Sequence, residues 1–237
     1  MTALGAVARV LFLHAHPDDE TLATGALIAD LVNRGVTVGV VTATRGEQGE
    51  TTDPALAADL VTLRERELAG ALAVLGVEHH GFLGEPPARA VGRPPRRYTD
   101  SGMAWVTPEL AGPGPQAGPE ALTAASVAEA ADDLVSYATW FGAEVLVSYD
   151  RFGGYGHPDH VACHHIAVLA AEQAGIGFVE IVSRQPGGPG PLDRYRELVA
   201  EALASYRSQL RVDGSDVVHV GGQRHPIPTA VELRRLS

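Results

Sequence analysis

The chain has 237 residues, of which 45% are hydrophobic and 20% charged, a composition typical of one sizeable globular domain. Its formal net charge is −11. Binding to nucleic acids or anionic membranes requires a basic surface, so we expect neither as a partner. Its single cysteine, Cys163, excludes a disulfide within the chain. The first apolar run is too short to span a membrane and leads into charged residues, so we expect no signal peptide or anchor, and a cytoplasmic protein.

Strand and helix patterns alternate along the chain, which predicts an α/β fold with a mostly parallel sheet and helices on both faces. The expected strands are 10–14, 36–42, 78–82, 144–148, 178–182 and 216–220. The first expected helix ends near residue 35. The next two run from 53 to 76 and from 120 to 141, the fourth begins at 158, and the fifth runs from 192 to 207. We therefore expect a single Rossmann-like domain over residues 1–237.

A long segment rich in proline and glycine interrupts this alternation at about residues 83–119. Connections of this length inside a compact domain are usually functional or disordered, and we expect both here. The part that ends at Met103 carries polar residues worth ordering, whereas residues 111–119 have the composition of a mobile surface loop.

Two clusters of polar residues each follow a buried strand at a strand-to-helix turn. They read His14-Ala15-His16-Pro17-Asp18-Asp19-Glu20 and His157-Pro158-Asp159-His160. In open α/β sheets, ligands bind at such turns, at the carboxyl ends of the strands. Histidine and carboxylate together suit a divalent ion such as zinc, so the two clusters predict a metal site at one edge of the sheet.

The spacing within the clusters allows a catalytic metal site. A histidine, an aspartate and a second histidine give zinc three protein ligands and leave one position for water. His16 and Asp19 supply the first two, and the second cluster supplies the third. Asp18 could accept the proton of that water, and His157 could hold an oxyanion or protonate a leaving amine, with Asp159 orienting its ring.

Each of these residues also has a structural interpretation. Adjacent aspartates at a helix start are often caps and partners of the helix dipole, and a single histidine at a strand end is usually a hydrogen-bonding residue. We keep the structural interpretation for Glu20 and for five other histidines, His14, His79, His80, His164 and His165. Two similar clusters at equivalent turns are a less probable coincidence than one, which favours a functional site.

The two clusters resemble the signatures of the LmbE-like (PIG-L) zinc-dependent N-deacetylases. The likeness covers about residues 8–175 and includes residues 44–50, Arg64, residues 100–103 and residues 149–157. It is strongest with the members that act in mycothiol biosynthesis, which remove acetate from N-acetylglucosaminyl-inositol. The resemblance implies a Rossmann-like hydrolase with a small aminosugar substrate.

The resemblance also implies a role for each residue of the signatures. His16, Asp19 and His160 would bind one zinc ion, and Asp18 would be the general base. His157 would be the electrostatic or acid partner of the reaction.

Four further residues have roles implied by the same resemblance. Asp159 would hold the ring of His157, and Tyr155 would be a mobile residue that stabilises the oxyanion. Arg64 and Asp100 would grip hydroxyl groups of the sugar-inositol substrate, which makes the segment 83–119 a wall of the pocket.

Other functions remain open from the sequence. Ala23 stands where the related amidase of mycothiol conjugates has lysine, which favours a deacetylase, but an amidase or deacetylase of another aminosugar conjugate in thiol or antibiotic metabolism is an alternative. A nucleotide-binding module is a weaker one, because no Gly-x-Gly-x-x-Gly follows the first strand. A non-catalytic sugar-binding protein and a homo-oligomer are both compatible with the sequence. The residues after about 186 do not match the family closely, so the sequence leaves the aglycone unspecified.

Overall fold

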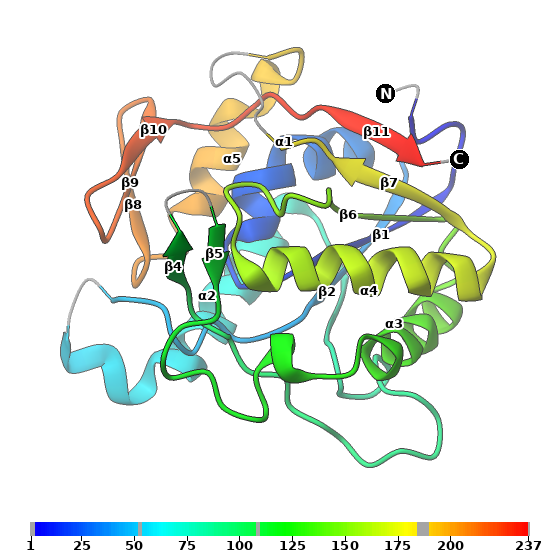
Figure 1. The fold of residues 1–237 in the computed structure, drawn as a ribbon. Coiled ribbons are helices and arrows are strands. Elements are labelled where there is room, and N and C mark those ends of the chain that lie inside the picture. The colour runs from blue at the N-terminus through cyan, green and yellow to red at the C-terminus, as the bar shows by residue number, and fades with distance from the viewer. Residues whose placement is uncertain (1–2, 52–53, 108–109, 184–189, 237) are drawn as a thin grey trace.

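In the computed structural model of the chain, residues 3–51, 54–107, 110–183 and 190–236 are described. A six-stranded sheet lies at the centre, and helices cover both of its faces (Figure 1). In spatial order, the strands are β11 (Leu233–Leu236), β7 (Gly177–Ile181), β6 (Val145–Tyr149), β1 (Arg9–His14), β2 (Thr37–Thr42) and β3 (His79–Phe82). Of these six strands only β11 runs antiparallel to its neighbour, so the predicted mostly parallel α/β sheet is confirmed.

The order of the strands changes direction between β1 and β6. The strands that follow β1 in the sequence, β2 and β3, lie on one side of it, and the later strands β6 and β7 lie on the other. β1 and β6 are parallel neighbours, with Phe12 opposite Val147. Their carboxyl ends therefore flank the crevice in which open α/β sheets bind ligands. Both polar clusters follow these two strand ends, after His14 and Tyr149.

Side chains of the central strands alternate between two apolar cores. Val10 and Phe12 belong to the core shared with α1, α2 and α5, and Leu11 and Leu13 to the core shared with α3 and α4. Burial on both faces explains why the central strands are almost continuously apolar. The helices are α1 (Asp19–Asn33), α2 (Leu60–Leu75), α3 (Val127–Phe141), α4 (Pro158–Ala174) and α5 (Arg196–Leu203).

Three helices begin later than the sequence predicts. A 3₁₀ helix over Pro54–Asp59 precedes α2, and residue 53, its expected start, lies outside the described residues. The residues expected to form the first turn of α3 pair with another segment instead, since the carbonyl of Glu120 accepts from the backbone N–H of Thr99. Ser126 then caps α3 by accepting from the N–H of Glu129. A short 3₁₀ turn likewise precedes α5.

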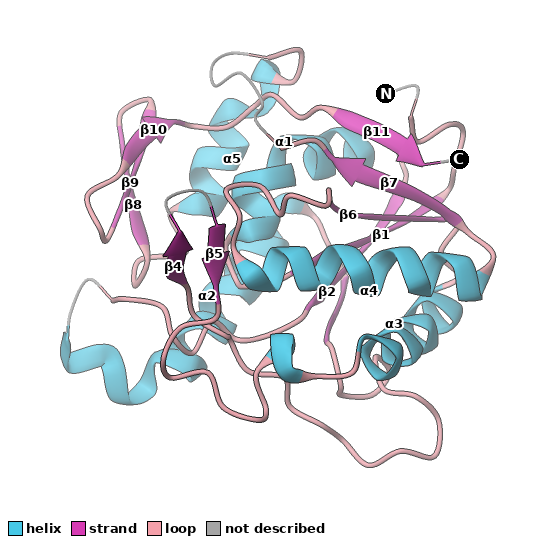
Figure 2. Cartoon of the chain, viewed as in Figure 1, coloured by secondary structure: helices cyan, strands magenta, loops and turns pink. Residues whose placement is uncertain are grey.

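Several short strands were not predicted. Figure 2 shows two small sheets beside the central one, of which only the middle strand of the second was expected. They consist of β4 (Ala104–Thr107) with β5 (Leu110–Gly112), and of β8 (Leu210–Asp213), β9 (Asp216–His219) and β10 (Arg224–Pro226). Strands of three or four residues carry too little periodicity to be recognised in a sequence. In the described part of the chain, no helix is both long and apolar enough to cross a membrane.

Candidate metal centre and catalytic site

The turn after β1 holds Asp18 in an unusual backbone conformation. Asp18 has φ 108°, the single positive φ among the described residues other than glycine. Such a conformation costs about 1–3 kcal/mol and persists only where the surroundings impose it. The N–H of Asp18 donates to Glu20 Oε2 at 3.1 Å, its carbonyl accepts from the N–H of Leu22 at 2.9 Å, and Arg64 Nη2 donates to its carboxylate at 3.2 Å. The Asp18 carboxylate is therefore held in one position.

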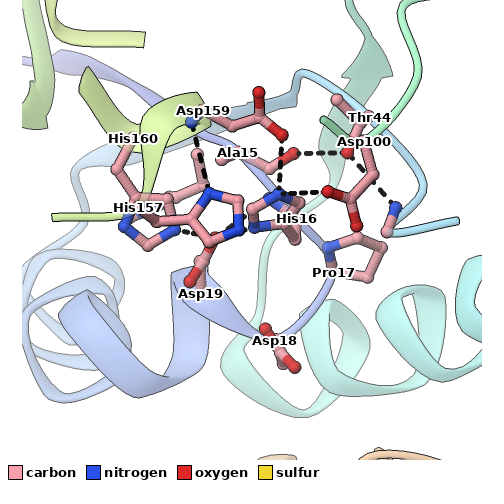
Figure 3. A network of polar contacts seen from close by, with 12 residues as sticks. Ala15, His16, Pro17, Asp18, Asp19, Thr44, Asp100, His157, Asp159 and His160 are labelled. Atoms are coloured by element: carbon pink, nitrogen blue, oxygen red, sulfur yellow. Dashed lines mark hydrogen bonds and ion pairs between the residues drawn. The ribbon is translucent and has the colours of Figure 1, made fainter. Parts of the chain in front are cut away.

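The three residues predicted to bind metal converge on one another. Asp19 Oδ2 lies 3.1 Å from His16 Nδ1 and 3.2 Å from His160 Nε2. Donors around a tetrahedral zinc ion lie about 3.4 Å apart, because each bond is about 2.0–2.1 Å long. The turn after β1 and the first turn of α4 thus bring together donors separated by more than a hundred residues in the sequence (Figure 3).

His160 provides independent evidence that the cluster fits a cation. The residue is only 2% exposed, and neither nitrogen of its ring has a hydrogen-bond partner. Its Nε2 faces the carboxylate of Asp19 without the geometry of a hydrogen bond. A buried imidazole without partners costs free energy unless another group satisfies it. A metal ion bound between His16, Asp19 and His160 would satisfy it, so these residues fit the ion.

His157 lies next to the side chains that are predicted to bind metal. One ring nitrogen from each of His16, His157 and His160 lies within 4.8 Å of the others. His157 is the N-cap of α4, and its Nδ1 accepts from the N–H of Asp159 at 3.2 Å. Burial, together with neighbouring His16 and His160, lowers the pKa of His157 to about 4. At neutral pH the ring is therefore uncharged and carries its proton on Nε2, where it can donate a hydrogen bond.

The carboxylate of Asp159 holds His16 and not His157, which corrects the expected pairing. Asp159 Oδ2 lies 3.2 Å from His16 Nε2, and Asp100 Oδ1 lies 3.6 Å from the same nitrogen (Figure 3). The reason is the capping geometry of α4, in which the backbone of Asp159 faces His157. Burial opposes a charge on His16, but Asp100, Asp159 and Asp19 outweigh it and raise the pKa of His16 well above its usual value. Carboxylates placed in this way orient a metal-binding imidazole.

The proton-accepting group expected in this site is Asp18. Burial raises the pKa of Asp18 to about 7, with Arg64 opposing the shift and Asp19 adding to it. The guanidinium of Arg64 is engaged with protein groups, since Nη1 donates to the carbonyl of Gly46 at 2.9 Å and Nη2 donates to Pro17 and Asp18. Arg64 therefore positions Asp18, in addition to lining the cavity where the sequence places it.

These residues lie in the wall of a cavity of about 970 Å³. The sequence-predicted residues that line it are His16, Asp18, Asp19, Arg64, Asp100, Tyr155, His157 and His160. Asp159 is fully buried behind them. Tyr155 is 64% exposed, and its ring centre lies 5.2 Å from that of His160. Gly102 and Met103 bring the proline-rich segment into the wall as well.

Tyr149 is a site residue to which the sequence analysis gave no role. Its ring stacks on His160 with centres 4.1 Å apart, and its hydroxyl accepts from the N–H of Ala15 at 3.1 Å. His14 Nδ1 lies 3.3 Å from the same hydroxyl, while burial lowers the pKa of His14 to about 4 and keeps it neutral. Tyr149 thus supports both turns. A tyrosine at the last position of a fully buried strand was the available signal.

Comparison with known proteins places this site in a family. The family model described as PIG-L, GlcNAc-PI de-N-acetylase, matches residues 11–171. A relative from Kineococcus radiotolerans, named 1D-myo-inositol 2-acetamido-2-deoxy-alpha-D-glucopyranoside deacetylase, is 37% identical over 230 residues. The match covers 94% of this chain and 60% of the relative, so the chain spans less than two thirds of that relative's length.

Solved structures agree on the fold. N,N'-diacetylchitobiose deacetylase from Pyrococcus horikoshii superposes with a TM-score of 0.63 at 20% identity, covering 87% of this chain and 72% of that one. A zinc-inhibited form of a teicoplanin deacetylase superposes with a TM-score of 0.56 at 22% identity, covering 84% of each chain. The family expected from the two polar clusters is confirmed: the chain belongs to the PIG-L family.

Proposed function

We propose that this chain hydrolyses the N-acetyl group of a small molecule that contains N-acetylglucosamine, of the N-acetylglucosaminyl-inositol type. The observation that carries the proposal is the position of Asp18, which Arg64 holds beside three convergent metal-binding side chains in one cavity. A carboxylate fixed next to a site for a divalent cation is suited to accept a proton in amide hydrolysis by water. The name of the Kineococcus radiotolerans relative supports the substrate class.

In the proposed site, His16, Asp19 and His160 hold one zinc ion. When bound, zinc lowers the pKa of a water molecule toward neutrality and polarises a carbonyl group. Asp18, kept in place by Arg64, accepts the proton of the attacking water. His157 donates the hydrogen on Nε2 to the oxyanion that develops on the amide carbonyl, and the hydroxyl of Tyr155 is a second donor at the exposed side of the cavity.

Asp159 and Asp100 complete the site in this proposal. Asp159 orients His16, and its backbone fixes the tautomer of His157. Asp100 is positioned by the N–H groups of Gln48 and Gly102, at 3.2 and 2.7 Å, and accepts from a hydroxyl of the sugar. The segment 83–119 thereby acts as a substrate wall of a single domain over residues 1–237.

A second candidate is hydrolysis of an N-acyl group on another aminosugar conjugate. The observation in its favour is the size of the cavity, since about 970 Å³ exceeds what one acetamido sugar needs. Part of its wall also lies beyond residues 11–171, the region matched by the family model.

The test is a measurement of primary-amine release by the zinc-loaded protein, with zinc content determined on the same sample. The panel comprises methyl N-acetylglucosaminide, N-acetylglucosaminyl-inositol, N,N'-diacetylchitobiose and an N-acylated glycopeptide. We expect the highest kcat/KM with the inositol glycoside. The second candidate is favoured if another conjugate is preferred, and the proposal is wrong if a protein with one zinc per chain releases no amine from any of them.

A further inference from the structure

The part of the cavity wall built by the small sheet β8–β10 contains a pair of histidines. His219 ends β9 and His225 lies in the middle of β10, and both line the cavity. His225 is paired with Val217 across the two antiparallel strands, so His219, two residues further on, is its diagonal neighbour on the same face. The N–H of His219 also donates to the carbonyl of Gln223 at 2.9 Å. The backbone of the hairpin therefore fixes the positions of both rings.

The two rings form a hydrogen bond whose direction can be deduced. His219 Nε2 lies 2.8 Å from His225 Nε2, and His225 Nδ1 lies 2.9 Å from the carbonyl oxygen of Pro226. A carbonyl only accepts, so His225 carries its hydrogen on Nδ1 and offers a lone pair on Nε2. His219 must then donate from Nε2, which leaves its Nδ1 as a free acceptor. Burial, followed by the effect of His225, lowers the pKa of His219, which is consistent with a neutral ring.

The charges around the cavity indicate which kind of substrate group can bind next to His219 Nδ1. Among the described residues that line the cavity, Arg64 is the only arginine or lysine, and both of its terminal nitrogens already contact protein oxygens. Four carboxylates, those of Asp18, Asp19, Glu50 and Asp100, line the same space. A phosphate or carboxylate on the aglycone would be repelled by these carboxylates, and among the described lining residues no arginine or lysine is free to offset the repulsion away from the metal ligands. An uncharged group with several hydroxyls avoids this repulsion and can donate to the acceptor on His219.

We propose that His219 Nδ1 accepts a hydrogen bond from a hydroxyl of an uncharged, polyhydroxylated aglycone, and that His225 is the positioning residue that fixes the tautomer of His219. This inference rests on the proposed function, because the N-acetylated sugar must occupy the end of the cavity that holds the metal ligands. The family model matches residues 11–171, so this contact lies outside the residues that the model matches. In this proposal His219 determines specificity for the aglycone, whereas the two metal-binding turns catalyse the hydrolysis.

The test compares the binding of two probes by titration calorimetry, in a background that carries Asp18→Asn to prevent turnover. The probes are methyl N-acetylglucosaminide, which lacks the aglycone, and N-acetylglucosaminyl-inositol, which carries it. His219→Leu should weaken binding of the inositol glycoside about 3- to 10-fold, the effect of one neutral hydrogen bond, and leave the methyl glycoside unchanged. His219→Asn, whose amide oxygen can replace Nδ1 as acceptor, should recover most of the loss.

Two further measurements separate a specific contact from a general effect on the fold. His165→Leu, at an exposed histidine of α4, is the matched control and should change neither affinity. In nitrogen NMR spectra, the ring of His219 should carry its hydrogen on Nε2, and His225→Phe should remove this preference. Unchanged binding of the methyl glycoside shows that each variant is folded.

The outcomes distinguish this inference from the proposed function. The inference is overturned if His219→Leu affects both probes equally or neither, or if N-acetylglucosamine 1-phosphate binds more tightly than the inositol glycoside. A wild-type protein that binds the inositol glycoside through His219 but releases no amine contradicts the proposed function alone. A wild-type protein that hydrolyses both probes with no preference for the aglycone contradicts this inference alone.

Discussion

The cavity joins two regions that differ in how their functional side chains are held. In the turns after β1 and β6, each side chain is fixed by a buried neighbour: Arg64 holds Asp18, Asp159 holds His16, and Tyr149 stacks on His160. In the wall from β8 to β10, a short hairpin presents one histidine pair, in which the rings contact each other and the carbonyl of Pro226. The proposed chemistry therefore depends on a charged region with buried supporting contacts, and the proposed contact with the aglycone depends on a short hairpin.

This difference has a consequence for substitutions. A change in the turn region removes a charge from a buried network and should reduce turnover or metal affinity by orders of magnitude. A change in the β8–β10 wall removes one neutral hydrogen bond and should alter affinity only several-fold. The following variants test this contrast, beginning with the largest expected effect.

Asp18→Asn should lower kcat by about 10²- to 10⁴-fold while zinc remains bound, because the amide cannot accept a proton but keeps the shape of the carboxylate. Arg64 can still donate to the amide oxygen, so the position of the side chain is preserved. Initial rates of amine release and zinc content are measured on the same preparation. A variant with near wild-type kcat would show that another group accepts the proton.

Asp159→Asn should weaken zinc binding about 10- to 100-fold, because it removes the negative charge that orients His16. The measurement is a competition titration against a chelator of known affinity. Asp100→Asn is the matched control and should have a smaller effect, since its contact with His16 is longer, 3.6 Å against 3.2 Å. Equal effects of the two variants would contradict the ranking of these contacts.

Tyr206→Phe should lower the free energy of unfolding by about 1–3 kcal/mol with little change in kcat. The hydroxyl of Tyr206, which follows α5, donates to the buried carboxylate of Glu20 at the start of α1, so its loss leaves that oxygen with Thr21 Oγ1 as its remaining donor. Denaturant titration gives the stability. Tyr195→Phe is the control and should cost less, because Arg194 still contacts Asp30 after the hydroxyl is lost. A fall in kcat as large as that of Asp18→Asn would place Tyr206 in the catalytic network instead.

The sequence predicted the turn region well because its information is local. His16, Asp18 and Asp19 lie within one turn, and β1 and β6 are long apolar runs whose parallel pairing brings the second cluster to the same edge. The partner of Asp159 could not be predicted, because it depends on how the first turn of α4 faces His16. That contact is visible only in three dimensions.

Of the three strands in the β8–β10 wall, only β9 was predicted from the sequence. The strands of this wall have three or four residues each, which is too short for a recognisable periodicity. His219 and His225 are six residues apart, a spacing that matches neither a metal motif nor a helix face. Only the hairpin register between β9 and β10 makes them neighbours. The proposed contact with the aglycone therefore could not be predicted from the sequence.

The zinc content of His160→Ala tests most directly whether two turns far apart in the sequence build one metal centre. We expect well under one zinc per chain and loss of amine release, with an unchanged circular dichroism spectrum. His165→Ala, at an exposed position of the same helix, should keep its zinc. Stoichiometric zinc in His160→Ala would show that the turn before α4 does not supply a ligand.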